Sequence, residues 1–188
     1  CVISVPSGNF GDLTAGIIAK VLGAPIKSFV AATNSNDTVP RYWQSGEWLP
    51  SPTIETLSNA MDVSQPNNWP RIEAMIERGL LDKSILSGDS IDEEYTQVAM
   101  KQLANQGYVS EPHAAIAYKS LSRHLQDGQT GIFLGTAHPA KFADVVEQAT
   151  GESVELPPAL AEALRRDERV ERIGPEYEPF RQQLERLV

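Results

Sequence analysis

The sequence predicts an α/β fold, in which a mostly parallel sheet carries helices on both of its faces. Short strand-like runs alternate along the chain with segments whose apolar residues recur at helical spacing. The runs at 2–5, 26–31 and 131–134 are largely apolar, without a regular polar alternation. Strands of this kind are typically buried on both sides, as they are in parallel sheets covered by helices.

The first half of the chain contains two of these strands and two helical segments. Residues 12–22 carry apolar side chains at helical spacing and are followed by Gly23, a typical helix cap. Residues 32–70 are rich in Asn, Ser, Thr, Pro and Trp without a clean period, so we expect mainly loop, with one helical turn near 53–60. Asn68, followed by Trp and Pro, predicts a cap and first turn of a helix that runs to Arg78.

The second half contains further helices and the third strand. The segment Ser-Ile-Asp-Glu at 90–93 fits a capping box for a helix to Asn105, and Pro112 opens a helix to Leu125. After the strand at 131–134, a helix is expected from Pro139. Residues 151–188 are punctuated by Pro and Gly and predict short amphipathic helices. We therefore expect residues 1–150 to form an α/β domain and residues 151–188 a helical appendage packed on it.

The turn at residues 7–11 reads Ser-Gly-Asn-Phe-Gly and joins the first strand to the first helix. Gly8 and Gly11 lack a Cβ, so the backbone can take positive φ there and come close to a ligand. The first turn of the helix adds N–H groups without an internal partner, and these groups and the helix dipole favour an anion. The turn therefore predicts a phosphate site. Two glycines are equally compatible with an ordinary, tightly packed strand-to-helix turn.

Three further segments occur after this turn, in a fixed order. They read ATNSNDTVPR at 32–41, TLSNAMDVSQPNNWPR at 56–71 and LGTAHPAKF at 134–142. Together with the turn, they resemble threonine synthase, a family of pyridoxal-phosphate (PLP) enzymes with the tryptophan synthase β-like fold (fold type II). The resemblance covers residues 1–150. It implies conversion of O-phosphohomoserine and water into L-threonine and phosphate.

The resemblance also implies which residues hold the cofactor. The phosphate of PLP would be held by Ser7, Gly8, Asn9, Phe10 and Gly11. The hydroxyl of Thr136 would face the ring nitrogen, where a neutral partner does not enforce protonation as a carboxylate does. Both segments would lie at the carboxyl ends of their strands, where ligands of open α/β sheets bind. The alternative for Thr136 is a cap of the following helix.

The substrate brings a second phosphate and an α-carboxylate. Arg41, Asn67, Asn68 and Arg71 are residue types that bind such groups, and they are our candidates for the substrate site. Asn and Arg in a Pro-rich loop also commonly serve turns and exposed surface. The sequence therefore leaves both interpretations open for each of them.

We expect none of the lysines in this chain to be the catalytic lysine. In the family, the lysine that forms the Schiff base with PLP lies upstream of the phosphate turn, in a Phe-Lys-Asp-type context. No lysine here has that context, and Lys141 belongs instead to the family's His-Pro-Ala-Lys-Phe segment. Because the chain opens with Cys1 inside an apolar run, we expect a carboxyl-terminal portion of the enzyme that is inactive alone. An incomplete sheet would leave an open edge prone to self-association.

Composition limits the binding partners, the compartment and the metal sites that we expect. A net charge of −9 disfavours nucleic acid and anionic membranes, and no apolar run approaches the ~20 residues of a membrane span. The single cysteine excludes an internal disulfide and suits the reducing cytoplasm. No metal-ligand spacing is present, so no metal is expected. His113 and His138, each beside a proline at a helix start, are interpreted as structural. A non-catalytic module that holds a nucleotide or phosphometabolite remains the alternative function.

Overall fold

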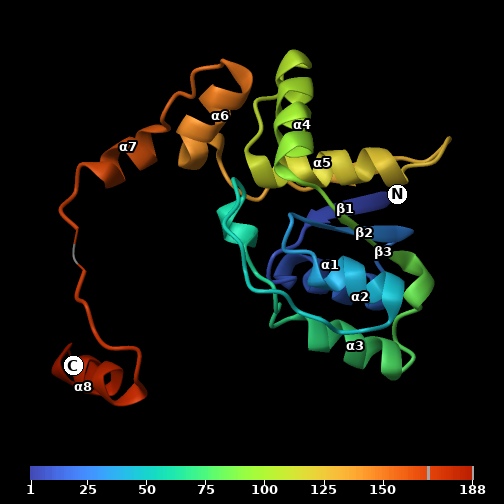
Figure 1. Ribbon diagram of the computed structural model, residues 1–188, viewed down its shortest axis with the longest axis horizontal. Coiled ribbons are helices and arrows are strands. Elements are labelled where there is room, and N and C mark those ends of the chain that lie inside the picture. Colours follow the sequence, from blue (N-terminus) through green and yellow to red (C-terminus); the bar gives the residue numbers. More distant parts are fainter. Residues whose placement is uncertain (169, 188) are drawn as a thin grey trace. The chain divides into compact units, whose positions relative to one another are not determined.

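The computed structural model describes residues 1–168 and 170–187 (Figure 1). The chain forms two compact units, Cys1–Glu155 and Leu156–Val188. The first unit contains the sheet and the phosphate turn. The expected packing of the tail on this body remains a prediction.

The first unit is built on four parallel strands in the order β3-β2-β1-β4. These strands are β1 (Val2–Pro6), β2 (Ser28–Thr33), β3 (Leu86–Ser90) and β4 (Gly131–Phe133). The register places Val2 opposite Ser28 on one side and opposite Gly131 on the other. The carboxyl ends of β1, β2 and β4 therefore lie at one edge of the sheet, which confirms the predicted parallel arrangement.

Helices cover both faces of this sheet (Figure 1). One face is covered by α1 (Gly11–Val21), α2 (Thr38–Ser45) and α3 (Trp69–Glu77). On the other side lie α4 (Glu93–Asn105) and α5 (Pro112–His124), with α6 (Ala143–Thr150) packed against α4. Three short 3₁₀ helices, η1 (Asn59–Met61), η2 (Lys83–Ile85) and η3 (Pro139–Phe142), join these elements.

Helices α1 and α3 contribute to one cluster of buried apolar residues. Trp69 is buried there, and its ring meets the rings of Phe10, Tyr42 and Trp43 at centroid distances of 5.6, 6.0 and 5.6 Å. All three pairs are close to perpendicular, which is a favourable arrangement for aromatic rings. This cluster links α2, α3 and the phosphate turn. It gives the turn a rigid support.

Two elements between residues 32 and 90 were not predicted. Helix α2 lies inside the expected loop, because Thr38, Val39 and Pro40 are buried and Trp43 packs on Trp69. Strand β3 has the polar sequence Leu-Ser-Gly-Asp-Ser, and it is an edge strand whose last four residues are only partly buried. Neither segment has a clean period, so tertiary contacts decide their structure.

The cap of α4 was assigned to the wrong residue. Asp92, and not Ser90, accepts the hydrogen bond from the N–H of Tyr95, at 2.9 Å. Ser90 ends β3, and its hydroxyl donates to the carbonyl of Asn34 at 3.0 Å. The predicted strand at 131–134 is likewise shorter than expected and only partly buried, because β4 forms the other edge of the sheet.

The second unit contains α7 (Pro158–Leu164) and α8 (Tyr177–Leu187), in agreement with the short helices predicted there. Neither helix has a buried residue. In the described part of the chain, no helix is long and apolar enough to cross a membrane.

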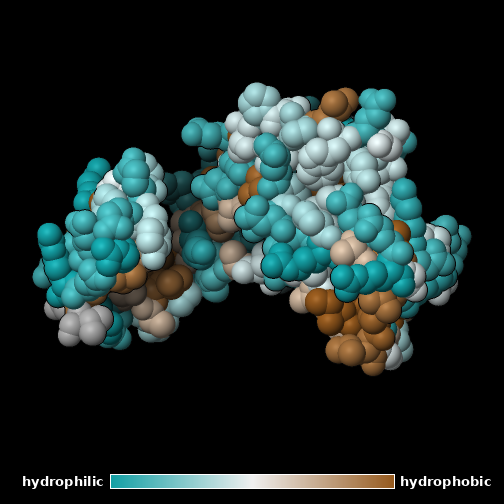
Figure 2. All heavy atoms as spheres, turned by 90° about the horizontal axis from the view of Figure 1, so that it is seen from below, coloured by the Kyte–Doolittle hydropathy of each residue, from teal (hydrophilic) through white to brown (hydrophobic). Residues whose placement is uncertain are grey.

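Apolar side chains are also exposed on the first unit. Ile18 and Val21 of α1 are exposed, and Leu22, which caps the helix, is 83% exposed. Figure 2 shows a mainly hydrophilic face with an apolar cluster at its lower right. Exposed apolar surface of this kind commonly marks an interface. It is compatible with the expected self-association, which remains a prediction.

Candidate phosphate and substrate site

The phosphate turn begins where β1 ends, at the carboxyl edge of the sheet. The N–H of Ser7 donates to the carbonyl of Ala32 at 2.7 Å, which ties the turn to the end of β2. The hydroxyl of Ser7 is buried and donates to the carbonyl of Val5 at 2.8 Å. Ser7 therefore fixes the direction in which the chain leaves the strand.

The next backbone N–H groups, those of residues 8–13, lack hydrogen-bond acceptors in the described residues. The first N–H to be paired is that of Thr14, which donates to the carbonyl of Phe10 at 3.0 Å. Unpaired N–H groups at the positive end of a helix favour an anion. This row fits the phosphate group of PLP.

Positive φ in the turn occurs at a residue other than the two glycines. The residue with positive φ is Phe10, at 62°, whereas neither Gly8 nor Gly11 adopts a positive φ. A left-handed conformation is unfavourable for a residue with a Cβ. Here it is held by packing, because the Phe10 ring is buried edge-on against Trp69. The turn therefore does not use the positive φ that the two glycines permit.

Gly8 is required by packing against a distant loop. A Cβ at Gly8 would lie 2.6 Å from the Cα of Met61 and 3.1 Å from the carbonyl oxygen of Ala60. A Cβ at Gly11 would meet only the amide nitrogen of Asn68, at 3.7 Å, an ordinary contact. The absence of a side chain thus has a clear steric reason at Gly8 and none at Gly11.

A polar cluster holds this loop against the turn. The carboxylate of Asp62 accepts hydrogen bonds from the side-chain amides of Asn34 and Asn36, at 2.9 and 3.1 Å, and from the hydroxyl and N–H of Thr56, at 2.7 and 3.0 Å. Asn34 follows β2 directly, so the cluster anchors residues 54–62 to the carboxyl edge of the sheet. Sequence reasoning missed these roles. The only sequence signal for these roles was the high content of Asn, Ser and Thr in the segment.

Three of the four substrate candidates lie next to the turn. The N–H of Asn67 donates to the side-chain oxygen of Asn9 at 2.5 Å, and the side-chain amide of Asn68 donates to the Asn9 carbonyl at 2.8 Å. Arg71 donates to the side-chain oxygen of Asn68 at 2.8 Å. The segment that begins α3 is therefore bonded directly to the phosphate turn.

Arg41 lies apart from this group. Its guanidinium donates to the carboxylate of Asp37 at 2.8 Å, to the carbonyl of Leu49 at 2.9 Å and to the hydroxyl of Ser51 at 3.2 Å. These contacts fasten the loop after α2 and occupy the guanidinium. Of the four candidates, Arg41 has the best defined structural role.

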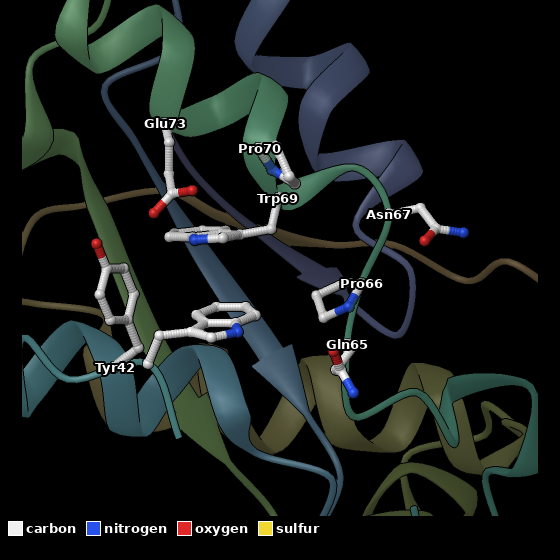
Figure 3. Close-up of a pocket in the computed structure, with 8 residues that line it drawn as sticks. Tyr42, Gln65, Pro66, Asn67, Trp69, Pro70 and Glu73 are labelled. Atoms are coloured by element: carbon white, nitrogen blue, oxygen red, sulfur yellow. The ribbon is translucent and has the colours of Figure 1, made fainter. Parts of the chain in front are cut away.

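A cavity of about 500 Å³ lies beside the same segment. Its walls are aromatic and polar side chains, shown in Figure 3: Tyr42, Trp48, Gln65, Pro66, Asn67, Trp69, Pro70 and Glu73. The labelled Glu73 carboxylate lies beside the Trp69 indole, and the Asn67 amide points away from the rings. The neighbouring Glu73 carboxylate is the main cause that raises the pKa of Tyr42 above its usual value.

Thr136 follows β4 at the same edge of the sheet as the phosphate turn. The N–H of Leu134 donates to the carbonyl of Ser4 at 3.1 Å, so the chain beyond it continues beside the end of β1. Thr136 is exposed and makes no hydrogen bond within the described residues. The cap of the following helix is His138, whose Nδ1 accepts from the N–H of Ala140 at 3.1 Å. The capping alternative for Thr136 was therefore wrong.

The two histidines have different surroundings. His138 is the structural cap that was expected. His113 does not cap α5: the carboxylate of Glu111 does so, accepting from the N–H groups of His113 and Ala114 at 2.7 and 2.8 Å. Glu111 also contacts Nδ1 of His113, and both side chains are buried. The described residues contain no group of three or more side chains suited to a metal ion.

Lys141 lies in η3, and its N–H donates to the carbonyl of His138 at 3.0 Å. The residue is exposed, and its side chain makes no hydrogen bond or ion pair in the described part of the chain. A lysine nucleophile is usually activated by burial in an apolar pocket or by a neighbouring cation, and this exposed side chain has neither in the described part of the chain.

Comparison with known proteins identifies relatives over most of the chain. The family model described as "Threonine synthase, C-terminal" matches residues 114–183. Threonine synthase of Serratia marcescens is 59% identical over 160 residues, which are 85% of this chain and 37% of the relative. The Escherichia coli (strain K12) enzyme is 58% identical over 161 residues, 86% of this chain and 38% of the relative.

Solved structures agree with these matches. The crystal structure of E. coli threonine synthase matches with a TM-score of 0.92 at 50% identity and covers all of this chain and 44% of that one. PLP-bound threonine synthase from Brucella melitensis matches with a TM-score of 0.79 at 31% identity, over 89% of this chain and 42% of that one. Maize serine racemase, at 18% identity and a TM-score of 0.53, shares the fold.

These matches confirm the predicted fold class, the large domain of PLP-dependent fold type II enzymes. The chain spans 37% and 38% of the length of the two curated relatives named above. In sequence and in fold, the chain is similar to the carboxyl-terminal part of threonine synthases.

Proposed function

We propose that this chain is the carboxyl-terminal part of a threonine synthase, a PLP-dependent carbon–oxygen lyase of threonine biosynthesis. The reaction converts O-phosphohomoserine and water into L-threonine and phosphate. The bond between the γ-carbon and its oxygen breaks, and the oxygen of water becomes the hydroxyl on the β-carbon. The cytoplasm is the proposed compartment.

The observation that carries the proposal is the row of unpaired N–H groups at residues 8–13. It lies at the carboxyl edge of a parallel sheet, where ligands of this architecture bind. The name of the Brucella relative's structure states that it holds PLP. A phosphate-binding turn in the same part of the fold is what PLP requires.

Each part of the site then has a role. The N–H groups of residues 8–13 would hold the cofactor phosphate, with Ser7 setting the course of the chain and Phe10 supplying the left-handed turn. Thr136 would accept or donate a hydrogen bond at the ring nitrogen. When bound, PLP supplies the electron sink for carbanion chemistry at the substrate.

Substrate binding is assigned to the segment beside the turn. Asn67, Asn68 and Arg71 would bind the substrate phosphate or carboxylate, since Asn67 and Asn68 are bonded to the turn that would hold the cofactor and Arg71 is bonded to Asn68. We rank Arg41 below them because its guanidinium is occupied within its own loop.

The fate of the water oxygen tests the reaction type. The whole PLP-loaded enzyme of which this chain is part is incubated with O-phosphohomoserine in ¹⁸O-water, and the products are analysed by mass spectrometry. We expect one ¹⁸O atom in threonine and none in phosphate. Labelled phosphate together with homoserine would identify a phosphatase, and no turnover would favour a non-catalytic phosphate-binding module.

The 188-residue chain by itself is expected to have no threonine synthase activity. Its exposed Lys141 has no feature that activates a lysine, and its remaining lysines lie outside the phosphate site's segments. The test is incubation with PLP, reduction with borohydride and mapping of any pyridoxyl-lysine by mass spectrometry. Stoichiometric labelling of Lys141 with phosphate release from phosphohomoserine would contradict the assignment.

Replacement of Thr136 should affect the cofactor and not the fold. In the whole enzyme, we expect Thr136→Ala to shift the absorption spectrum of bound PLP and to lower turnover about tenfold or more, the usual order for one lost active-site hydrogen bond. The melting temperature should not change, because Thr136 caps no helix. Thr136→Ser keeps the hydroxyl and should restore both properties. A loss of stability with an unchanged spectrum would contradict the role.

A further inference from the structure

Apart from Asn67, the residues that line the cavity beside α3 have no role in the proposed reaction. Tyr42 lies in α2, Trp48 in the loop that follows it, and Trp69 and Glu73 lie in α3. The rings of Tyr42 and Trp48 are 5.4 Å apart at 78°, and those of Tyr42 and Trp69 are 6.0 Å apart at 85°. Trp48 is 38% exposed, so part of this aromatic wall is open to a ligand.

Glu73 places a negative charge on the same wall. Figure 3 shows its carboxylate between the Trp69 indole and the Tyr42 hydroxyl. Within the described part of the chain, no Lys, Arg or His forms an ion pair with Glu73. Glu77, one turn further along, adds to the negative field, since both carboxylates raise the pKa of Tyr42. Glu73 is partly buried, and Lys83 lines a neighbouring cavity together with Glu73 and Glu77 without forming an ion pair with Glu73.

The adjoining part of this aromatic cluster already binds a cation. The ammonium of Lys83 lies 4.6 Å from the centre of the Trp43 ring, and that ring packs on Trp69. The cation–π contact therefore occurs on the neighbouring side of the cluster. The cavity also has aromatic walls, but it is lined by the Glu73 carboxylate and by no lysine.

We propose that the cavity lined by Tyr42, Trp48, Trp69 and Glu73 binds an organic ammonium cation. The charged nitrogen lies at the Glu73 carboxylate, and its alkyl groups lie against the aromatic rings. Aromatic surfaces attract such cations through the ring quadrupole, and a nearby carboxylate adds a direct charge interaction. The volume of about 500 Å³ accommodates a small molecule of this class. The site is distinct from the N–H row that would hold phosphate.

Choline and its uncharged carbon isostere, 3,3-dimethylbutan-1-ol, provide the test. Each is titrated into the purified protein, and binding is followed by tryptophan fluorescence and calorimetry. We expect choline to saturate a single site and to bind at least tenfold more tightly than the isostere. Equal binding of the two would overturn the proposal, because it would identify an apolar pocket. Absence of saturable choline binding would also overturn it.

Two variants locate the site. Glu73→Gln keeps the shape of the side chain and removes its charge, so the affinity for choline should fall at least tenfold while the affinity for the isostere is unchanged. Glu94→Gln is the matched control, because Glu94 is an exposed carboxylate in α4, outside the cavity. Equal affinities for choline in the Glu73→Gln variant and the unmodified protein would overturn the assignment. The readout is binding alone, so it is independent of whether the protein is a threonine synthase.

Discussion

Replacing Gly11 with aspartate is expected to weaken PLP binding by the whole enzyme about 100-fold. The new carboxylate would lie beside the unpaired N–H groups that we assign to the cofactor phosphate. Two like charges about 4 Å apart repel by several kcal/mol at an effective dielectric constant of about 20, and about 2.7 kcal/mol corresponds to a 100-fold loss. The measurement is the dissociation constant of PLP, determined by equilibrium dialysis or cofactor absorbance.

The fold should tolerate this substitution. A Cβ at position 11 meets only the Asn68 amide, at 3.7 Å, and the glycine does not have a positive φ. An acidic residue in the first turn of a helix is favoured by about 0.3–1 kcal/mol through the helix dipole. The melting temperature should therefore be unchanged or slightly raised. Loss of cofactor with gain of stability would separate a charge effect from misfolding.

Gly11→Asn is the matched control, since asparagine has nearly the same shape without the charge. We expect it to bind PLP within a few-fold of the unmodified enzyme. If the Asp and Asn variants lost affinity equally, steric hindrance would explain both results. If neither lost affinity, residues 8–13 would not be the phosphate site.

Replacing Gly8 with valine is expected to reduce both stability and cofactor retention. The Cβ would lie 2.6 Å from the Cα of Met61, a backbone atom that cannot rotate away. Overpacking of a tight site costs about 1–3 kcal/mol, and we expect the upper part of this range because the loop is anchored by the Asp62 cluster. Chemical denaturation gives the free energy of unfolding, and dialysis gives the cofactor retained.

Gly11→Ala is the comparison for this second experiment. The contact made by its Cβ is ordinary, so its free energy of unfolding should stay within about 0.5–1 kcal/mol of the original, the range for Gly-to-Ala changes in helices. A Gly8→Val protein of full stability that failed to bind PLP would show that Gly8 approaches the ligand directly. That result would contradict the steric explanation.

The sequence alone determined the parallel α/β architecture and the position of the turn between β1 and α1. Local signals were sufficient, because apolar runs identify covered strands and the turn precedes a periodic helix directly. They also identified α1, α3, α4, α5 and α6 within a few residues. The same segments carried the resemblance to threonine synthase, which the relatives and solved structures then bore out.

Only the tertiary structure explains why particular residues occupy the turn. Gly8 is a glycine because of Met61, which lies far away in sequence, and Phe10 adopts a positive φ because its ring is fixed against Trp69. Helix α2 and strand β3 have no periodic pattern and form through contacts with other elements. Likewise, Asp62 acquires its role only when Asn34, Asn36 and Thr56 converge on it. Such contacts join residues distant along the chain, and local propensity contains no information about them.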